Sequence, residues 1–195
     1  MPDYEKLIRN LERSGFQVTY FDTAAQAVDY LDAQLDGRDI GFGGTVTVPQ
    51  MGLVDRLKTH NTLHATWLGG TREDGRTVQV YISSVNALAE TGEVINIDGI
   101  GNRVAEGLFG HEKVIFIVGV NKICPDYDSA LWRAKNVAAP KNAQRLGRKT
   151  PCAVKADRCY DCRSPERICN ALVVYWHKPS GMDYEIVLVN EELGL

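Results

Sequence analysis

The residues best suited to chemistry are four cysteines that stand close together in the C-terminal third of the chain. Cys152, Cys159, Cys162 and Cys169 follow the spacing C-x6-C-x2-C-x6-C. Sets of four thiolates hold zinc or an iron–sulfur cluster in proteins. The surrounding segment, about residues 147–170, is polar and has no apolar periodicity, so it cannot build a core of its own. Metal binding would supply the folding free energy of such a segment, and we therefore expect a metal centre.

The spacing of these cysteines favours an iron–sulfur cluster over zinc. Structural zinc sites usually present two close cysteine pairs, whereas this segment has one, Cys159 and Cys162. A 4Fe-4S cluster accepts wider spacing because its iron atoms occupy a larger volume. The nearby Arg158, Arg163 and Arg167 could offset the negative charge of a cluster. A 4Fe-4S cluster is the expected cofactor, with a zinc ion or an unmetallated thiol pair as alternatives.

A glycine-rich stretch in the first half of the chain is a candidate for anion binding. Residues 41–45 read Gly-Phe-Gly-Gly-Thr and follow an expected strand. Small residues at such a transition let backbone N–H groups approach an anion at the start of the next helix. Gly43, Gly44 and Thr45 are therefore candidate substrate-binding residues. The P-loop lysine is missing, so the pattern is a weak indication of ATP or a dinucleotide. A tight turn that requires a positive φ is the alternative explanation.

Residues 83–103 form a second candidate ligand-binding segment. They are rich in Asn, Asp, Glu and Gly at the ends of expected strands, where open α/β sheets bind their ligands. Glu90 is the candidate general base, and Arg103 could pair with a carboxylate or a phosphate. The alternative is that Asn and Gly only shape turns while Glu90 and Arg103 face solvent. The side chains expected to bind substrate are Asn86, Asn96, Asp98, Asn102 and Arg103, together with Lys122 from the next expected strand end.

The histidines give little indication of a metal or catalytic site. His60, His64, His111 and His177 form neither an H-E-x-x-H nor an H-x-H pattern, and we expect them on the surface or in the core. The G-x-S-x-G motif of serine hydrolases does not occur in the sequence. A histidine-based metal site and a serine hydrolase are therefore both disfavoured.

Helix and strand patterns alternate along the chain and must position these residues. β-branched and apolar runs predict strands, and apolar residues at helical spacing predict the helices between them. This βαβ order predicts an α/β fold with a mostly parallel sheet covered by helices, in which the candidate segments converge. The expected strands cover residues 17–21, 39–42, 62–67, 78–82, 94–97, 113–118, 172–176 and 185–189, and the longer helices cover residues 24–35, 102–108 and 126–138.

The composition is that of an ordinary globular domain. The chain has 195 residues, of which 44% are apolar and 24% charged, so we expect a single domain over residues 1–195, with the cysteine-rich segment as an insertion before the final strands. The 22 basic and 25 acidic residues give a net charge of −3. No polybasic block indicates nucleic acid as a partner, and no apolar run approaches the roughly 20 residues of a membrane span. The first residues lack a secretory signal, so we expect a cytoplasmic location without disulfides.

Several of these segments together resemble the lactate-utilisation (LUD) domain family. The resemblance is carried by residues 41–47, 86–92, 96–103 and 118–122. Further runs, at residues 139–142, 149–152 and 161–165, are similar to a subgroup of short, cysteine-bearing members. The resemblance implies a NagB/RpiA/CoA-transferase-like fold, a small-molecule carboxylate or phosphate ligand, and a homodimer.

The resemblance also implies a function in the metabolism of 2-hydroxy acids. It favours a redox or accessory role in lactate utilisation beside iron–sulfur partner subunits. Isomerase-like proteins of this fold carry an acidic residue where Asn86 stands, and a neutral amide cannot accept a substrate proton. The alternative is a non-redox enzyme, such as an isomerase, lyase or transferase, that acts on a small organic acid or phosphorylated ligand beside a structural zinc or cluster. A third hypothesis is a sensor in which residues 147–170 reorder when a cluster is lost.

Overall fold

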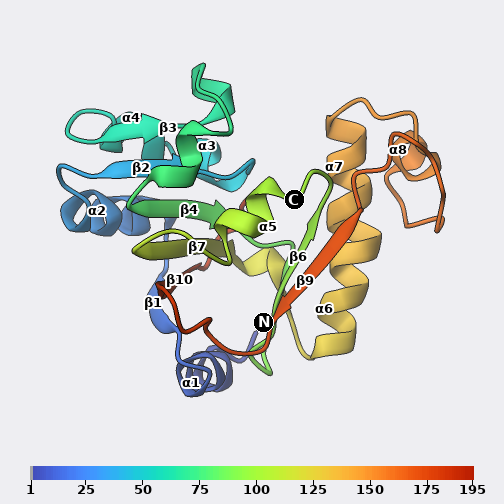
Figure 1. Ribbon diagram of the computed structural model, residues 1–195. Helices are drawn as coiled ribbons and strands as arrows, with labels where there is room; N and C mark the ends of the chain where they lie inside the picture. The colour runs from blue at the N-terminus through green and yellow to red at the C-terminus, as the bar shows by residue number, and fades with distance from the viewer. Residues whose placement is uncertain (1) are drawn as a thin grey trace.

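A six-stranded parallel sheet forms the centre of the larger part of the molecule (Figure 1). The structure is a computed structural model and describes residues 2–195. Each neighbouring pair of strands in this sheet is parallel, which confirms the predicted α/β fold. In spatial order the strands are β1 (Gln17–Phe21), β10 (Asp183–Val189), β7 (Lys113–Gly119), β4 (Val80–Ser84), β2 (Asp39–Phe42) and β3 (Thr62–His64).

The two faces of this sheet bury different helices. Ile115 and Ile117 of β7 belong to a core that includes residues of α2 (Ala24–Gln34), α3 (Thr47–Gln50) and α4 (Leu53–Leu57). Val114, Phe116 and Val118 belong to a second core with α1 (Tyr4–Arg13). Successive side chains of a strand point to opposite faces, so a strand covered on both faces reads as a continuous apolar run. The apolar run expected to form a strand over residues 113–118 is β7.

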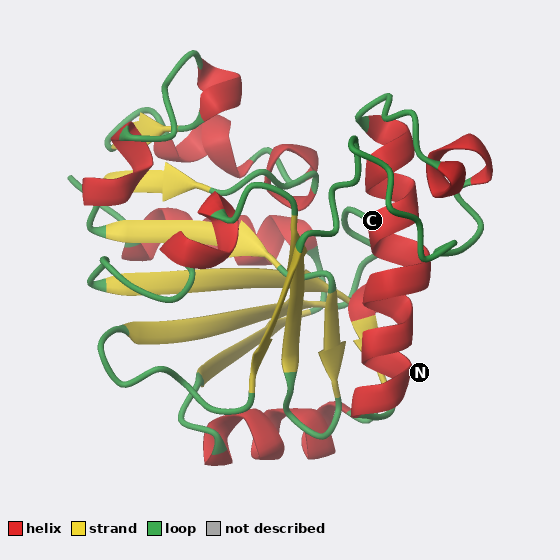
Figure 2. Ribbon diagram, turned by 45° about the vertical axis from the view of Figure 1, so that its right-hand side comes forward, coloured by secondary structure: helices red, strands yellow, loops and turns green. Residues whose placement is uncertain are grey.

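A second, four-stranded sheet stands beside the first (Figure 2). Its order is β8 (Ile123–Cys124), β5 (Ala87–Ala89), β6 (Val94–Asp98) and β9 (Ala171–Tyr175). β6 runs antiparallel to β5 and to β9, so this sheet is not an extension of the parallel one. The predicted strands at residues 94–97 and 172–176 are correct, but the sequence patterns did not separate them from the parallel sheet.

A rod of three helical segments covers this second sheet (Figure 1). It consists of α6 (Tyr127–Arg133), one turn of π-helix, η4 (Ala134–Ala138), and α7 (Ala139–Arg145). The prediction of a helix over residues 126–138 is therefore correct, but it places the end of the helix too early, since the helical rod continues to Arg145. The remaining helices are short: η1 (Thr66–Leu68), η2 (Asp74–Thr77), α5 (Asn102–Glu106), η3 (Val120–Lys122) and α8 (Pro151–Lys155). Within residues 2–195, the structure contains no helix with the length and apolar character that a membrane crossing requires.

Residues 147–170 connect α7 to β9 and pack against the turn between β6 and α5. Asn170 donates its backbone N–H to the carbonyl oxygen of Asp98 at 2.9 Å, and its Nδ2 donates to the carbonyl oxygen of Gly99 at 2.9 Å. A Cβ atom built on Gly99 would lie 3.1 Å from the backbone of Ile168, a tight contact that a larger residue could make only if the Ile168 backbone shifted. The cysteine-bearing segment is thus held against the turn that carries several of the candidate residues.

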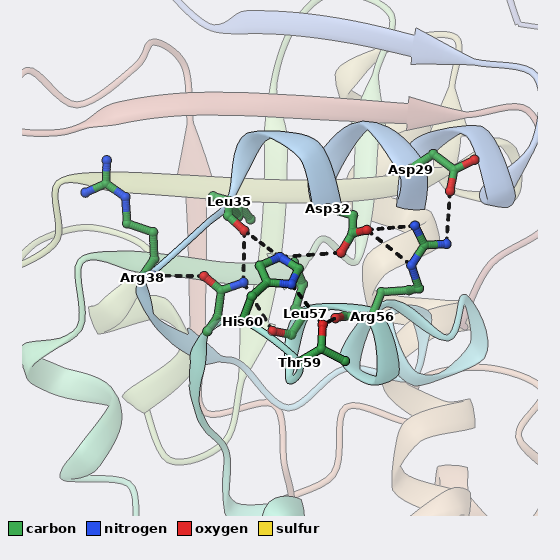
Figure 3. A network of polar contacts seen from close by, with 9 residues as sticks. Asp29, Asp32, Leu35, Arg38, Arg56, Leu57, Thr59 and His60 are labelled. Carbon is green, nitrogen blue, oxygen red and sulfur yellow. Dashed lines mark hydrogen bonds and ion pairs between the residues drawn. The ribbon is translucent and has the colours of Figure 1, made fainter.

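A polar network ties the ends of α2 and α4 to the start of β2 (Figure 3). The Nδ2 atom of Asn61 donates to the carbonyl oxygens of Leu35 at 2.9 Å and Leu57 at 3.1 Å. Its Oδ1 atom accepts the backbone N–H of Arg38 at 2.9 Å, and His60 Nε2 lies 3.0 Å from the Leu35 carbonyl oxygen. Because β2 leads directly into the glycine-rich stretch, this network helps to position a candidate ligand-binding loop.

We predict that Asn61→Ala lowers the free energy of unfolding by about 2 kcal/mol, because two carbonyl groups and one N–H lose their hydrogen-bond partner. The matched variant Arg56→Ala removes exposed ion pairs to Asp29 and Asp32 in the same network. It should cost clearly less than Asn61→Ala does, since solvent screens such pairs. Urea unfolding of both variants checks this ranking, and equal losses would contradict it.

Candidate functional site

Three loops that follow parallel strands meet at the carboxyl edge of the six-stranded sheet. They are residues 43–45 after β2, residues 85–86 after β4, and η3 after β7. A cavity of about 290 Å³, which we call the main cavity, lies at this edge. Its wall includes Gly44, Tyr81, Asn86, Asp98, Asn102, Arg103, Glu106 and Arg145. This placement agrees with the general rule for open parallel sheets.

A second, smaller cavity of about 60 Å³ adjoins the main cavity, and we call it the lysine cavity. Gly44, Asn86, Arg103, Asn142 and Arg145 line both cavities. The lysine cavity is further lined by Thr45, Ser84 and Lys122. A ligand that fills both spaces would contact the glycine-rich stretch, the loop after β4 and α7 together.

The guanidinium of Arg103 holds these loops in place. Its Nη1 atom donates to the carbonyl oxygen of Ser84 at 3.2 Å and to Asn96 Oδ1 at 2.6 Å. Its Nη2 atom donates to Asn86 Oδ1 at 3.2 Å and to the carbonyl oxygen of Ile97 at 2.6 Å. Its Nε atom lies 3.3 Å from Asp98 Oδ2. Four hydrogen bonds and one ion pair thus hold the guanidinium, so the geometry favours a positioning role over direct pairing with a ligand.

Gly43 makes room for this arrangement. A Cβ atom built on Gly43 would lie 2.5 Å from Tyr81 Oη, 2.6 Å from Ser83 Oγ and 3.0 Å from Arg103 Cγ. Neither Gly43 nor Gly44 is among the glycines of positive φ, so the alternative explanation by a left-handed turn does not apply. Gly43 is required for space, whereas Gly44 faces both cavities.

Lys122 is buried at the wall of the lysine cavity. Its Nζ atom donates to Ser84 Oγ at 2.8 Å and to Thr47 Oγ1 at 2.9 Å, and its residue is 3% exposed. No acidic side chain within residues 2–195 forms an ion pair with it. Burial, followed by the nearby cations Arg133 and Arg103, lowers the pKa of Lys122 to about 7. An anion in the lysine cavity would supply the missing counter-charge.

Glu90 lies apart from the other candidate residues. Its carboxylate accepts the backbone N–H of Asp3 at 3.0 Å and the Nζ of Lys6 at 3.2 Å. Its carbonyl oxygen accepts Nδ2 of Asn10 at 2.8 Å. Glu90 lines none of the cavities described above. These contacts attach α1 to the end of β5, so the hypothesis that Glu90 is the general base has no support from its position.

The sequence analysis missed two residues of the main cavity. Glu106 and Tyr81 line it, and both contact His111, whose side chain is fully buried. Glu106 Oε2 lies 3.0 Å from His111 Nε2. Tyr81 stacks on the His111 ring with 5.3 Å between ring centroids, and burial raises the pKa of its phenol. His111 lies in the core, one of the two places expected for the histidines, but its contact with a cavity carboxylate was not foreseen.

The four candidate metal ligands line a third space. Cys152, Cys159, Cys162 and Cys169 all border one cavity of about 250 Å³, the cysteine cavity. All four thiols are free. Among the described residues, no three His, Cys, Asp or Glu side chains are grouped so as to hold one metal ion. The thiols therefore border a volume and do not meet at a point.

Arg167 provides polar contacts at the wall of the cysteine cavity. Its Nη2 atom donates to Cys169 Sγ at 3.4 Å, and its Nε atom is buried with no hydrogen-bond partner among the described residues. The backbone N–H of Asp161 donates to Cys159 Sγ at 3.3 Å. An anionic group of sulfide and thiolate in this cavity would give the unpaired N–H an acceptor.

The fold and these cavities define an α/β protein with a candidate ligand site at the carboxyl edge of a parallel sheet. The sequence profile of the LUD domain matches residues 4–189, so the chain belongs to the LUD domain family. This membership supports a role related to lactate utilisation.

One solved structure supports this fold. A DUF162 family protein from Deinococcus radiodurans is similar over 95% of both chains, with 11% identity and a TM-score of 0.57. eIF2B beta from Chaetomium thermophilum is similar over 55% of this chain and 45% of its own, with 15% identity and a TM-score of 0.40. No curated protein matches the sequence.

We predict that Lys122 makes stability depend on pH. Its pKa of about 7 in the folded state lies below the ordinary 10.5, so the unfolded chain binds more protons between these values. The free energy of unfolding should therefore rise with pH from 7 to 9, by up to about 1.4 kcal/mol per pH unit. Below pH 7 both states carry the proton and this dependence ends. Urea unfolding of wild type and Lys122→Met at several pH values measures it, and parallel curves for the two proteins would contradict it.

Proposed function

We propose that this LUD-domain protein binds a small 2-hydroxy or 2-oxo carboxylate in the main and lysine cavities and serves a redox or accessory role in its use. The observation that carries the proposal is the buried Lys122 ammonium, which lacks an acidic partner within residues 2–195. A buried charge is costly unless it is paired. A carboxylate in the lysine cavity would pair it.

Further cations line the main cavity and support an anionic ligand. Arg72, Arg145 and Arg148 border it, and none of them forms an ion pair with an acid of the described residues. Arg145 is oriented by Asn142, whose Oδ1 accepts from Nε at 3.0 Å and from Nη2 at 2.8 Å. Because Arg145 and Asn142 line both cavities, a carboxylate between them can contact Arg145 and Lys122.

We further propose that Cys152, Cys159, Cys162 and Cys169 hold a 4Fe-4S cluster in the cysteine cavity. The common cavity, the buried Arg167 Nε without an acceptor and the N–H contact to Cys159 Sγ support this choice over a single zinc ion. Such a cluster would supply one-electron transfer when bound.

The cysteine cavity adjoins the main cavity, which supports a redox role. Ile97, Ala139 and Ile168 line both. An electron carrier in one cavity would therefore lie beside a metabolite in the other. Iron–sulfur partner subunits would then accept or deliver the electrons. These partners, a homodimer and the cytoplasmic location remain predictions from the sequence.

A non-redox enzyme with a structural metal centre is the second candidate. Asn170 joins the cysteine-bearing segment to Asp98 and Gly99, which line the main cavity. A metal centre that orders this segment would also order part of the substrate site. In this function the cluster or zinc stabilises the cavity and takes no part in the reaction.

For the ligand, we predict that calorimetric titration detects binding of L-lactate or pyruvate to the wild-type protein. Lys122→Met should weaken that binding by about 10- to 100-fold, because one hydrogen bond to a charged group is lost. The control Lys58→Met replaces an exposed lysine paired with Asp55 and should bind as wild type does. Unchanged affinity in Lys122→Met would rule out the lysine cavity as the carboxylate site.

For the cluster, we predict that anaerobically purified or reconstituted protein contains about four iron and four sulfide per chain. Cys162→Ser should lose most of this iron and the visible absorbance, whereas Cys124→Ala should retain both. Cys124 is a buried cysteine outside the set of four. Stoichiometric zinc in place of iron would favour the structural alternative, and protein that takes up no metal would end both.

A further inference from the structure

The hydrogen-bonded pair of Glu106 and His111 fixes how one carboxyl group of the main cavity can bond to a ligand. Glu106 is the last residue of α5, and His111 lies in the loop before β7. Glu106 lines the main cavity. Behind it, the His111 side chain is fully buried, with Nδ1 at 2.9 Å from the Val78 carbonyl oxygen and Nε2 at 3.0 Å from Glu106 Oε2.

The proton positions in this pair follow from its partners. The Val78 carbonyl can only accept, so the contact at 2.9 Å places a proton on His111 Nδ1. The contact between Nε2 and Oε2 needs a second proton, because two lone pairs would otherwise face each other. This proton belongs either to an imidazolium beside a carboxylate or to a carboxylic acid beside a neutral imidazole. In both cases the other carboxyl oxygen, Oε1, carries no proton and can only accept.

The surroundings keep the pair in this orientation. Tyr81 stacks on the His111 ring with an interplanar angle of 9°. The backbone N–H of His111 donates to the sulfur of Met182 at 3.2 Å. A ring held at Nδ1, at Nε2 and on one face cannot rotate without breaking these contacts. The contact with His111 therefore occupies Oε2, and Oε1 is the carboxyl oxygen available to a ligand.

From this geometry we propose that Glu106 determines specificity by accepting a hydrogen bond from a hydroxyl group of the ligand. The inference rests on the proposed function, in which the ligand is a small carboxylate. A 2-hydroxy acid donates to Oε1, whereas a 2-oxo acid presents a second acceptor there and is disfavoured. His111 is the positioning residue, because it removes the option of a proton on Oε1.

The other charged groups of the two cavities do not supply this discrimination. The carboxylate of Asp98 already accepts the backbone N–H groups of Ile100 and Gly101 and pairs with Arg103. Arg145 of the main cavity and Lys122 of the lysine cavity are cations and attract the carboxylate that hydroxy and oxo acids share. Among these charged groups, Glu106 is the one with a carboxyl oxygen that can accept a hydrogen bond from the ligand.

The test compares the dissociation constants of L-lactate and pyruvate by calorimetry in four proteins: wild type, Glu106→Leu, Glu106→Gln and the control Glu12→Gln on the exposed surface of α1. Wild type and Glu12→Gln should bind lactate at least about tenfold tighter than pyruvate. Glu106→Leu should bind both with similar affinity, because it keeps the cations but has no acceptor.

Glu106→Gln is the informative conservative variant. Its amide N–H can donate to a neutral His111 Nε2, which turns the amide oxygen toward the ligand as an acceptor. This variant should therefore keep a preference for lactate that Glu106→Leu loses. Thermal melting of each variant verifies that it is folded at the temperature of the titration.

Three outcomes would overturn the inference. The first is a wild-type protein that binds pyruvate as tightly as lactate. The second is a Glu106→Leu variant that retains the preference, and the third is a Glu106→Gln variant that behaves as Glu106→Leu does. Each would exclude the role of Glu106 while leaving the carboxylate site intact. Failure of wild type to bind either acid would instead overturn the proposed function, and the specificity role with it.

Discussion

The arrangement of the site depends on one partly buried side chain, Arg103, whose guanidinium joins the two sheets. Its contacts reach the end of β4 through Ser84, the start of β5 through Asn86, and three consecutive residues at the end of β6. These strand ends are polar and buried, so their carbonyl and amide oxygens need donors that water cannot supply. One planar group with donors in fixed directions can satisfy several of them at once, which a lysine ammonium cannot do. The space for this group exists because position 43 lacks a side chain.

The use of arginine at these strand ends concentrates positive charge in a protein whose net charge is −3. Arg133, which is also buried, donates to the carbonyl oxygens of Asn86 and Asn121, and burial lowers its pKa. Together with Arg103 it lowers the pKa of Lys122. Asp98 neutralises part of this charge, and the remainder faces the lysine cavity. The cations that hold the backbone together therefore also create the field that an anionic ligand would complete, so the structural role of Arg103 does not remove it from the chemistry of the site.

The sequence predicted most of what depends on local pattern. β7 and β10 are largely apolar runs buried on both faces, and the loops that follow parallel strands had to meet at one edge once the βαβ order was recognised. Errors arose where tertiary contacts decide. The hypothesis that Glu90 is the general base stays a prediction and gains no support from its position, because α1 packs there and its Lys6 pairs with the carboxylate. The spacing of Glu106 and His111 in the sequence matches no known motif. His111 is held behind the cavity by its contact with the Val78 carbonyl oxygen, 33 residues away in the sequence. Short strands of a second sheet carry too few residues to reveal their pairing.

Asp98 links the separate parts of the site to one another. Its side chain accepts from the turn before α5 and pairs with Arg103, its residue lines the main cavity, and its carbonyl oxygen holds Asn170 of the segment that bears the cysteines. The adjacent Gly99 faces the backbone of Ile168, and an added Cβ would make a tight contact with it at 3.1 Å. Since Ile168 lines both the main and the cysteine cavities, displacement of this segment must move a wall that the two cavities share. The order of the cysteine-bearing segment and the shape of the ligand site are therefore not independent properties, whichever chemistry the cysteines perform.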